Sequence, residues 1–422
     1  MGSLLNLAIV AVLLATFYNP VHRQLTVLGV LRGAIDEDKL AHKQPFHKID
    51  DTVHCEDLHY HEPSGTIFAA CEDSTLSRFK WFPPLVNWEA PEYSAGSIHT
   101  IDPRAMESTR LNVKNFSGSF ITHGIDVLVD PDRSDAVYIF AVNHLPNPEY
   151  HRFGSHDQNN PKARSQVELF HHILGSNTAR HVRSIRHPAI VTPNDIYATS
   201  PASFYLTNDH FYRDGLRRQF EDLIPAAKWS NVIHIQLDSL ETTYTEAGVN
   251  ATVALTGIQN NNGLGHGITG DEVLISNAIG GILYRGRVQS ETRSISILDE
   301  LQLESSIDNP SYYRDPYRTS SNDASGYVLA GLRRSIDLAK THADPKGKDG
   351  AMVWYTRPKV TKEGSVVEWD TRLIFEDDGS IIRTASTALL VPIQPKAQEP
   401  KSAWLFVTGF FSESIIAVEV AL

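Results

Sequence analysis

The chain has 422 residues, of which 50 are acidic and 38 are basic, so its formal net charge is −12 at pH 7. This acidic balance, together with the lack of any Lys/Arg run, argues against nucleic acid as a partner. No Ser/Gly-rich or Pro-rich linker divides the sequence. We therefore expect a leader or anchor over residues 1–22 and one domain over residues 23–422.

The N-terminal segment is an apolar run from Leu4 to Tyr18, interrupted only by Asn6 and Thr16. It is short for a bilayer span and suits the hydrophobic region of a secretory signal. No basic residue precedes it and no clean small-residue cleavage site follows it, so an uncleaved anchor and a buried first strand both stay open. We expect the protein to enter the secretory pathway. If it associates with a membrane or lipid, we expect this segment to make the contact.

Short runs rich in β-branched and aromatic residues recur along the chain at intervals of roughly 55–75 residues. That interval exceeds a hairpin and suits a four-stranded blade with its loops, so we predict an all-β, six-bladed β-propeller with a central tunnel. The six runs are Gly65–Cys71, Ala136–Val142, Ser203–Thr207, Glu272–Ser276, Gly326–Leu329 and Ala403–Val407.

Further strand candidates follow most of these runs, at Val167–Phe170, Val232–Ile235, Ile282–Tyr284, Met352–Tyr355 and Ile415–Val420. Long amphipathic helices are scarce. Only Gln166–Leu174 and Leu329–Ala339 compete as helices, and both patterns are ambiguous.

The chain has two cysteines, Cys55 and Cys71, separated by a strand pattern, a Pro-Ser-Gly turn and a second strand pattern. If these strands pair, the cysteines lie near the open end of the hairpin, where a disulfide requires suitable Cβ geometry. In an oxidising compartment we expect the bridge. Two glycosylation sequons, at Asn115 and Asn250, agree with such a compartment.

Acidic or amide side chains recur shortly before strand-like runs. These side chains offer oxygen ligands and no sulfur. Hard cations such as Ca²⁺ prefer oxygen ligands and take six to eight of them. The innermost strands of a propeller line its channel, so ligands distant in sequence become neighbours there. The sequence predicts a composite Ca²⁺ site from Glu56-Asp57, Asn194-Asp195, Asn262 and Asp308-Asn309.

Other motifs are weaker. His59 and His61 would share one face of a strand and mimic a transition-metal pair, but no third ligand has convincing spacing, and we expect a solvated face. We assign no role to His171-His172. The Gly-rich segment 260–267 lacks the Gly-Lys-Ser/Thr ending of a phosphate loop, and no Gly-x-Ser-x-Gly elbow supports a serine hydrolase.

The motifs CEDL, HGID, VNH, PNDIYA and TNDHFY, in this order, resemble those of the paraoxonase/arylesterase family of calcium-dependent lactonases. The best stretch runs from Ile185 to Tyr212, and the resemblance fades around Pro146–Arg164 and Pro310–Ala324. The resemblance implies a six-bladed propeller with two calcium ions in its central tunnel.

The resemblance also implies roles for individual residues. A catalytic calcium would be bound by Glu56, Asn194, Asn262, Asp308 and Asn309, and a structural calcium by Asp57, Asp195 and the carbonyl of Ile125. His123 would be the general base, with His144 behind it, and Asp209 and His210 would line the tunnel or support the site.

The function implied is calcium-dependent hydrolysis of small-molecule lactones and aryl esters. Calcium would polarise the carbonyl while a neutral imidazole activates water. Two alternatives stay open: a propeller enzyme of the gluconolactonase or strictosidine-synthase type, and a non-catalytic secreted propeller that uses calcium for stability.

The sequence departs from the family at two places. Where family members carry a cysteine and a histidine near the active-site wall, this chain has Leu332 and Arg333, which puts the substrate range in doubt. An arginine facing the tunnel would favour an anionic or strongly polar substrate, whereas a surface arginine would not. The last strand has no cysteine, so ring closure must rely on strand pairing or on a different first strand.

Overall fold

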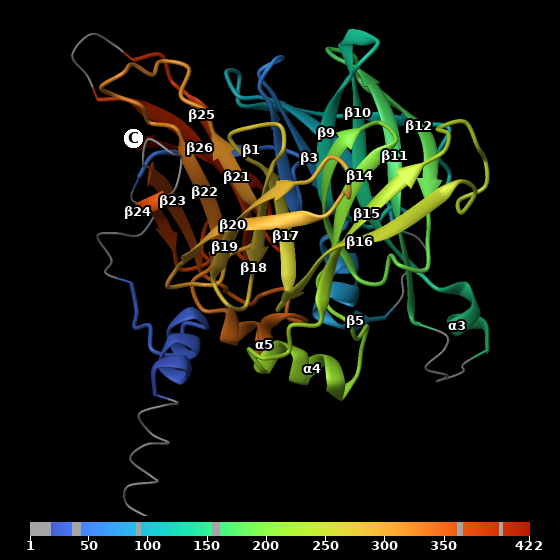
Figure 1. The fold of residues 1–422 in the computed structure, drawn as a ribbon, viewed down its shortest axis with the longest axis horizontal. Helices are drawn as coiled ribbons and strands as arrows, with labels where there is room; N and C mark the ends of the chain where they lie inside the picture. The colour runs from blue at the N-terminus through green and yellow to red at the C-terminus, as the bar shows by residue number, and fades with distance from the viewer. Residues whose placement is uncertain (1–17, 36–43, 90–93, 154–160, 361–365, 396–399) are drawn as a thin grey trace, which may run out of the picture.

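Antiparallel sheets of four or five strands follow one another along the chain in the computed structural model (Figure 1). The structure describes residues 18–35, 44–89, 94–153, 161–360, 366–395 and 400–422, and within these there are six such sheets and one two-stranded ribbon. The first strands of the sheets contact one another in the closed order β2, β9, β13, β17, β21, β25 and back to β2. This ring of blades confirms the predicted six-bladed β-propeller.

The first three blades run in chain order. Blade 1 contains β2 (Asp57–His61), β3 (Thr66–Cys71), β6 (Ser97–Asp102) and β7 (Glu107–Arg110). Blade 2 contains β9 (Thr122–Asp130), β10 (Arg133–Pro146), β11 (Ala163–Ile173) and β12 (Thr178–Ile185), with β8 (Asn112–Lys114) added in parallel at its outer edge. Blade 3 contains β13 (Pro193–Ser200), β14 (Ser203–Asn208), β15 (Ser230–Leu237) and β16 (Val249–Ile258).

The second half of the ring has the same pattern. Blade 4 contains β17 (Asn261–His266), β18 (Glu272–Asn277), β19 (Ile282–Val288) and β20 (Ile295–Gln302). Blade 5 contains β21 (Pro310–Tyr313), β22 (Gly326–Leu332), β23 (Ala351–Val360) and β24 (Val366–Asp377). Blade 6 contains β25 (Ala385–Pro392), β26 (Ser402–Gly409), β27 (Ile415–Ala421) and β1 (Phe46–Ile49).

All six predicted runs lie in the second strand of a blade, and the further candidates lie in third strands. Second strands carry the most continuous apolar pattern because they are buried between neighbouring blades, and β14, β18 and β22 are buried at every position. The ambiguous segment 166–174 is strand β11, not a helix. Segment 329–339 is the end of β22 followed by a short 3₁₀ turn, Ser335–Asp337, and the start of α5 (Leu338–Thr341).

The ring is closed by strand pairing. Strand β1, from near the start of the described chain, pairs antiparallel with β27, the last strand, with Phe46 opposite Val418 and Ile49 opposite Ile415. The N-terminal strand therefore supplies the outermost strand of blade 6, and no disulfide between the ends is needed.

Apolar side chains fill the spaces between blades. One buried cluster, for example, joins Phe140 and Leu169 of blade 2 to Phe204 and Ile235 of blade 3, and comparable clusters lie between the other neighbouring pairs. Burial of a Phe or Leu side chain contributes roughly 1.5–3 kcal/mol. This packing holds the first strands in place around the tunnel.

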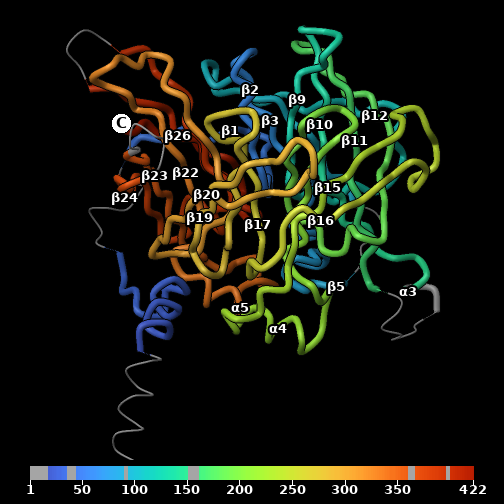
Figure 2. Tube along the Cα trace, in the orientation of Figure 1, coloured from blue at the N-terminus to red at the C-terminus, as the bar shows by residue number. Residues whose placement is uncertain are grey.

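Short helices gather on one side of the ring, which we call the helical face; it is the lower edge in Figures 1 and 2. Helices α2 (Thr75–Lys80), α3 (Pro148–Phe153), α4 (Leu216–Leu223) and α5 lie in connections from second to third strands, as do the 3₁₀ turn Pro83–Leu85 and the ribbon of β4 (Trp81–Phe82) and β5 (Asn87–Trp88). In an antiparallel blade these connections lie on the same side as the start of the first strand. The opposite side is the far face.

Residues 18–27 are helical, and the segment that follows packs on blades 4 and 5. Val27 is fully buried, Arg23 donates to the carbonyl of Gly280 at 2.8 Å, and Arg334 donates to the carbonyl of Gly29 at 2.6 Å. No helix among the described residues is long and apolar enough to cross a membrane. Most of the predicted leader, residues 1–17, lies outside the described residues, so its role stays a prediction.

Candidate functional site

The predicted ligands lie where first strands begin, at the helical-face end of the tunnel. Glu56 directly precedes β2, and Asn194 and Asn262 are the second residues of β13 and β17. Asp308 and Asn309 directly precede β21. Four different blades therefore contribute polar side chains to one level of the tunnel.

Two glycines let the first strands approach closely. A Cβ added at Gly124 of β9 would lie 2.5 Å from the carbonyl oxygen of Asn194, and one at Gly263 of β17 would lie 2.5 Å from the Cα of Asn309. No real Cβ tolerates such distances, so these positions require glycine for close backbone approach. The close approach brings the ligand-bearing residues of neighbouring blades together.

Direct contacts join the cluster across blades. The Asn309 amide donates to Glu56 Oε1 at 3.0 Å and to Thr387 Oγ1 at 3.0 Å. Thr387, in β25 of blade 6, in turn donates to Asp57 Oδ1 at 2.7 Å. Sequence reasoning missed Thr387, and only the expectation that every first strand faces the tunnel could have pointed to it.

A set of buried oxygen atoms in this cluster has no hydrogen-bond partner among the described residues. Buried polar atoms are nearly always paired, and each exception calls for a reason. These five atoms are Glu56 Oε2, Asn194 Oδ1, Asn262 Oδ1, Asp308 Oδ1 and Asn309 Oδ1. They belong to the residues predicted to bind the catalytic calcium, and a hard cation that takes oxygen ligands fits them.

The carboxylates repel one another. Burial raises the pKa of Glu56 well above its usual range, and the charge of Asp308 raises it further. Burial likewise raises the pKa of Asp308 and Asp195, and it raises that of Asp57 to about 6. A divalent cation among these groups would oppose all of these shifts, because it stabilises the charged forms.

The residues predicted for the structural calcium lie one step deeper. Asp57 Oδ2 accepts from the backbone N–H of Ile125 at 2.9 Å, and Asp195 Oδ2 accepts from that of Leu264 at 2.7 Å. Asp57 is also the main charged neighbour that raises the pKa of Asp195. The structure thus gathers Asp57, Ile125 and Asp195, which come from blades 1, 2 and 3.

His123 and His144 are in contact beside the cluster. His123 Nδ1 lies 2.8 Å from His144 Nε2, and His144 Nδ1 lies 2.9 Å from Ser165 Oγ. On its other side, His123 Nε2 lies 3.5 Å from the Asn194 amide nitrogen and 3.6 Å from Glu56 Oε1. His123 therefore separates His144 from the ligand cluster.

The hydrogen-bond network assigns the tautomers of both rings. The Asn194 amide nitrogen can only donate, so His123 Nε2 is an acceptor and the His123 proton is on Nδ1. That proton is donated to His144 Nε2, and the His144 proton on Nδ1 is then donated to Ser165. This arrangement leaves the lone pair of His123 Nε2 facing the cluster.

Both imidazoles are neutral near pH 7. Burial lowers the pKa of His123 well below its usual value, and His144 and Arg78 lower it further. Burial also lowers the pKa of His144 to about 3. A neutral imidazole with an unprotonated ring nitrogen, such as His123 Nε2, can accept a proton from water.

Aromatic side chains cover this pair. The Phe82 ring lies 5.3 Å from the His123 ring and 6.5 Å from the His144 ring, and it belongs to a buried cluster with Phe79, Phe410 and Phe411. Arg78, fully buried in α2, lies over the Phe82 ring and donates to the carbonyl of Thr122 at 2.8 Å. Neither Phe82 nor Arg78 had a motif that singled it out in the sequence.

Asp209 and His210 lie close by, under α4. His210 Nδ1 is 3.0 Å from Asp209 Oδ1, and His210 Nε2 is 2.5 Å from Asp222 Oδ1. Burial and Arg218 lower the pKa of His210, but Asp209 and Asp222 outweigh them and raise it to about 9. His210 is thus a buried cation that supports the site.

We expect the protein to lose stability as pH rises from about 6.5 through about 9. A histidine whose folded pKa is raised contributes stability that is complete below its unfolded value of 6.5 and is lost as pH passes the folded value of about 9. The measurement is the melting temperature against pH for wild type and His210→Gln, with His47→Gln as control. If the melting temperature of His210→Gln fell with pH as steeply as that of wild type, the raised pKa of His210 would not be the cause.

The cavities do not coincide with this cluster. A cavity of about 20 Å³ lies beside His144, Ser165 and Asp209, with room for about one water. A much larger cavity, of about 340 Å³, extends from Asp57 to the far face. We place the chemistry at the ligand cluster itself, where the unpaired oxygens lie beside His123; of the imidazole pair, His144 lines the smaller cavity and His123 does not.

Other sequence expectations have mixed outcomes. The Cys55–Cys71 disulfide is present, which confirms that prediction, and Cys55 directly precedes Glu56 in the chain. Both sequon asparagines, Asn115 and Asn250, are exposed, and their glycosylation stays a prediction. Arg333 is buried and pairs with Glu376 at 2.7 Å, so it is not a surface arginine.

The expectation of a solvated histidine face on β2 is wrong. His61 is buried and bonds to Ser64, and His59 Nδ1 lies 2.8 Å from Asp126 Oδ1. The side chains that meet His59 come from other blades: Asp126 lies on β9, and His266 on β17 contacts the same carboxylate. The adjacent His171 and His172 point to different partners, His171 to Asp130 and His172 to the carbonyl of Thr178.

Comparison with known proteins adds the following. The model of the family described as Arylesterase matches residues 96–320, just over half of the chain. Serum paraoxonase/arylesterase 2 of Gallus gallus is 37% identical over 117 residues, 28% of each chain, so most of that relative lies outside the match. The protein of the same name from Bos taurus is 24% identical over 303 residues, 71% of this chain and 72% of its own.

Among solved structures, a luciferin-regenerating enzyme covers 91% of this chain and 94% of its own at 10% identity, with a TM-score of 0.45.

Proposed function

Since the chain belongs to the arylesterase family, we propose that it is a calcium-dependent hydrolase of lactones and aryl esters. One observation carries the proposal: five unpaired buried oxygens, on side chains from four blades, converge beside a neutral imidazole pair. Oxygen ligands next to a general base are the parts that metal-assisted hydrolysis needs.

Two sets of residues would hold two calcium ions. Glu56, Asn194, Asn262, Asp308 and Asn309 would hold the ion nearer His123, and Asp57, Asp195 and the Ile125 carbonyl would hold a deeper, structural one. When bound, calcium supplies an electrophile that polarises the substrate carbonyl and stabilises the developing oxyanion.

The chain's own residues move the proton. His123 Nε2, unprotonated in the network above, removes a proton from the attacking water. His144 accepts the hydrogen bond from His123 Nδ1 at 2.8 Å and thereby orients the ring and stabilises its charged form. Ser165 Oγ accepts the hydrogen bond from His144 Nδ1 at 2.9 Å and thereby orients the His144 ring. No covalent nucleophile is required.

The surroundings favour an apolar substrate. Phe82 and the Phe410-Phe411 pair pack beside the imidazoles, and this apolar wall keeps both rings neutral by excluding water. Arg333 is already paired with Glu376, so it does not select for an anionic substrate. We therefore infer a hydrophobic lactone or aryl ester rather than a charged one.

Secretion is part of the proposal. The Cys55–Cys71 bridge suits an oxidising compartment, and both sequon asparagines are accessible at the surface.

The test is hydrolysis of a small panel of aliphatic lactones and aryl esters by the purified protein, before chelation, after chelation and after calcium is restored. We expect activity to disappear with the chelator and to return with calcium. Activity that is indifferent to chelation would contradict a metal-assisted mechanism. If activity is absent throughout while calcium still raises the melting temperature, the binding-propeller alternative is favoured.

A further inference from the structure

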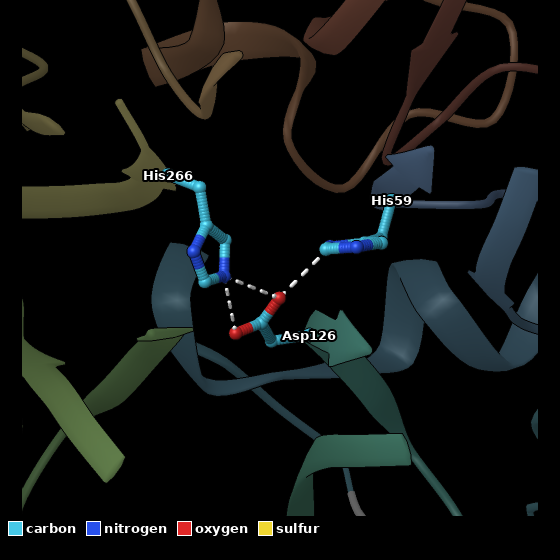
Figure 3. Close-up of side chains that lie close together, drawn as sticks. All are labelled: His59, Asp126 and His266. Atoms are coloured by element: carbon cyan, nitrogen blue, oxygen red, sulfur yellow. Dashed lines mark hydrogen bonds and ion pairs between the residues drawn. The ribbon is translucent and has the colours of Figure 1, made fainter. Parts of the chain in front are cut away.

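A second polar cluster lies deeper in the tunnel, toward the far face, beyond the residues proposed for the structural calcium. It consists of His59 on β2, Asp126 on β9 and His266 on β17, whose side chains point toward one another (Figure 3). His59 follows Glu56 by three residues of extended chain, which is about 10 Å at 3.3 Å per residue. Three blades thus contribute one ligand each.

The spacing of the donor atoms is close to that of a metal site. Asp126 Oδ1 lies 2.8 Å from His59 Nδ1, and Asp126 Oδ2 lies 2.9 Å from His266 Nε2. All candidate ligand atoms lie within 4.8 Å of one another. Ligand atoms around a tetrahedral zinc, with bonds of roughly 2.0–2.2 Å, are about 3.3 Å apart. An ion therefore requires the two His–Asp contacts to widen by a few tenths of an ångström and the two imidazole nitrogens, within 4.8 Å of each other, to settle at a similar spacing.

Neighbouring groups hold the ligands in orientation. The backbone N–H groups of Val127 and Ala198 donate to the two Asp126 oxygens at 2.9 and 2.6 Å. The His266 ring packs on the Tyr197 ring with centroids 4.5 Å apart. Metal ligands in proteins characteristically have such supporting contacts.

The cluster also has room for a further ligand. All three side chains line the cavity of about 340 Å³, so water can reach the side of the cluster that the protein leaves open. Two imidazoles, a carboxylate and one water make a donor set that zinc accepts, whereas calcium prefers oxygen alone.

We propose that His59, Asp126 and His266 bind a divalent transition-metal ion of the zinc class, with its fourth position open to the far-face cavity. This site differs from the calcium cluster in donor chemistry, and it borders the residues proposed for the structural calcium: His59 is two residues past Asp57, and Asp126 directly follows Ile125. Because it joins blades 1, 2 and 4, an ion bound there stabilises the folded ring.

The test uses the full-length protein with calcium kept saturating, titrated with Co²⁺ as a coloured substitute and then with Zn²⁺. We expect one Co²⁺ per chain, with the visible absorption of a tetrahedral site, displaced by Zn²⁺, and a melting temperature that rises with Zn²⁺. His59→Ala and His266→Ala should each weaken binding by more than the roughly 10–100-fold lost with a supporting contact.

His171→Ala is the matched control, because His171 Nε2 also lies 2.8 Å from a carboxylate, Asp130, but has no second imidazole in the group. It should bind Co²⁺ like wild type. Asp126→Asn removes the carboxylate charge and keeps the side-chain shape. A calcium-dependent shift of the melting temperature in each variant shows that the variant is folded.

Absence of stoichiometric Co²⁺ binding in wild type, or undiminished binding in folded His266→Ala, would show that the three residues are only a hydrogen-bonded triad. Neither readout depends on hydrolysis, so failure here is distinguishable from failure of the proposed function.

Discussion

Replacing His123 by glutamine is expected to lower kcat for aryl esters by roughly 10²–10⁴-fold, the usual contribution of a general base. The glutamine amide still reaches His144 but cannot accept a proton from water. Calcium binding should persist, because His123 is not one of the residues with unpaired oxygen ligands. The measurements are kcat for one aryl ester and the calcium-dependent shift of the melting temperature.

His171→Gln is the control for this substitution, since His171 lies outside the cluster against Asp130. It should leave kcat unchanged. If His123→Gln kept nearly all of the wild-type kcat, another group must activate water, and the order of the imidazole pair proposed above would be wrong.

Replacing Glu56 by glutamine is expected to change stability in opposite directions with and without calcium. The Glu56 side chain is fully buried, and burial followed by the charge of Asp308 raises its pKa. Without calcium, glutamine removes this repulsion, so the variant should melt at a higher temperature than wild type. With calcium, the variant lacks a charged ligand, and breaking a buried ion pair costs about 3–5 kcal/mol, which corresponds to roughly 10²–10⁴-fold in affinity.

Calcium titration of the chelated proteins, followed by melting temperature and by calorimetry, measures both effects. Glu72→Gln is the matched control, because Glu72 is equally buried but is bonded to the Ser77 and Ser94 hydroxyls. Its calcium affinity should equal that of wild type. An undiminished affinity in Glu56→Gln would exclude Glu56 as a ligand.

Local sequence was sufficient for the fold because each blade repeats the same local pattern. The second strands, such as Ser203–Asn208, are buried on both faces and therefore show as continuous apolar runs bounded by turn residues. First strands carry polar residues where they begin, as in Thr122-His123 of β9 and Asn194-Asp195 of β13, so apolar runs alone did not reveal them. The motifs PNDI and CEDL located two of them, because ligand pairs such as Asn194-Asp195 stand at their starts.

By itself, the sequence determined that the chain forms a ring of β-blades, that Cys55 and Cys71 can pair, and that acidic and amide side chains lie near strand starts. Only the tertiary structure decided which of these groups meet. Thr387 contacts Asp57 across 330 residues, and His266 contacts Asp126 across 140, and no local pattern encodes either neighbour. The reason is physical: residue type and strand period are local properties, whereas the neighbour of a side chain across a tunnel depends on how all the blades pack and on the register at which the ring closes.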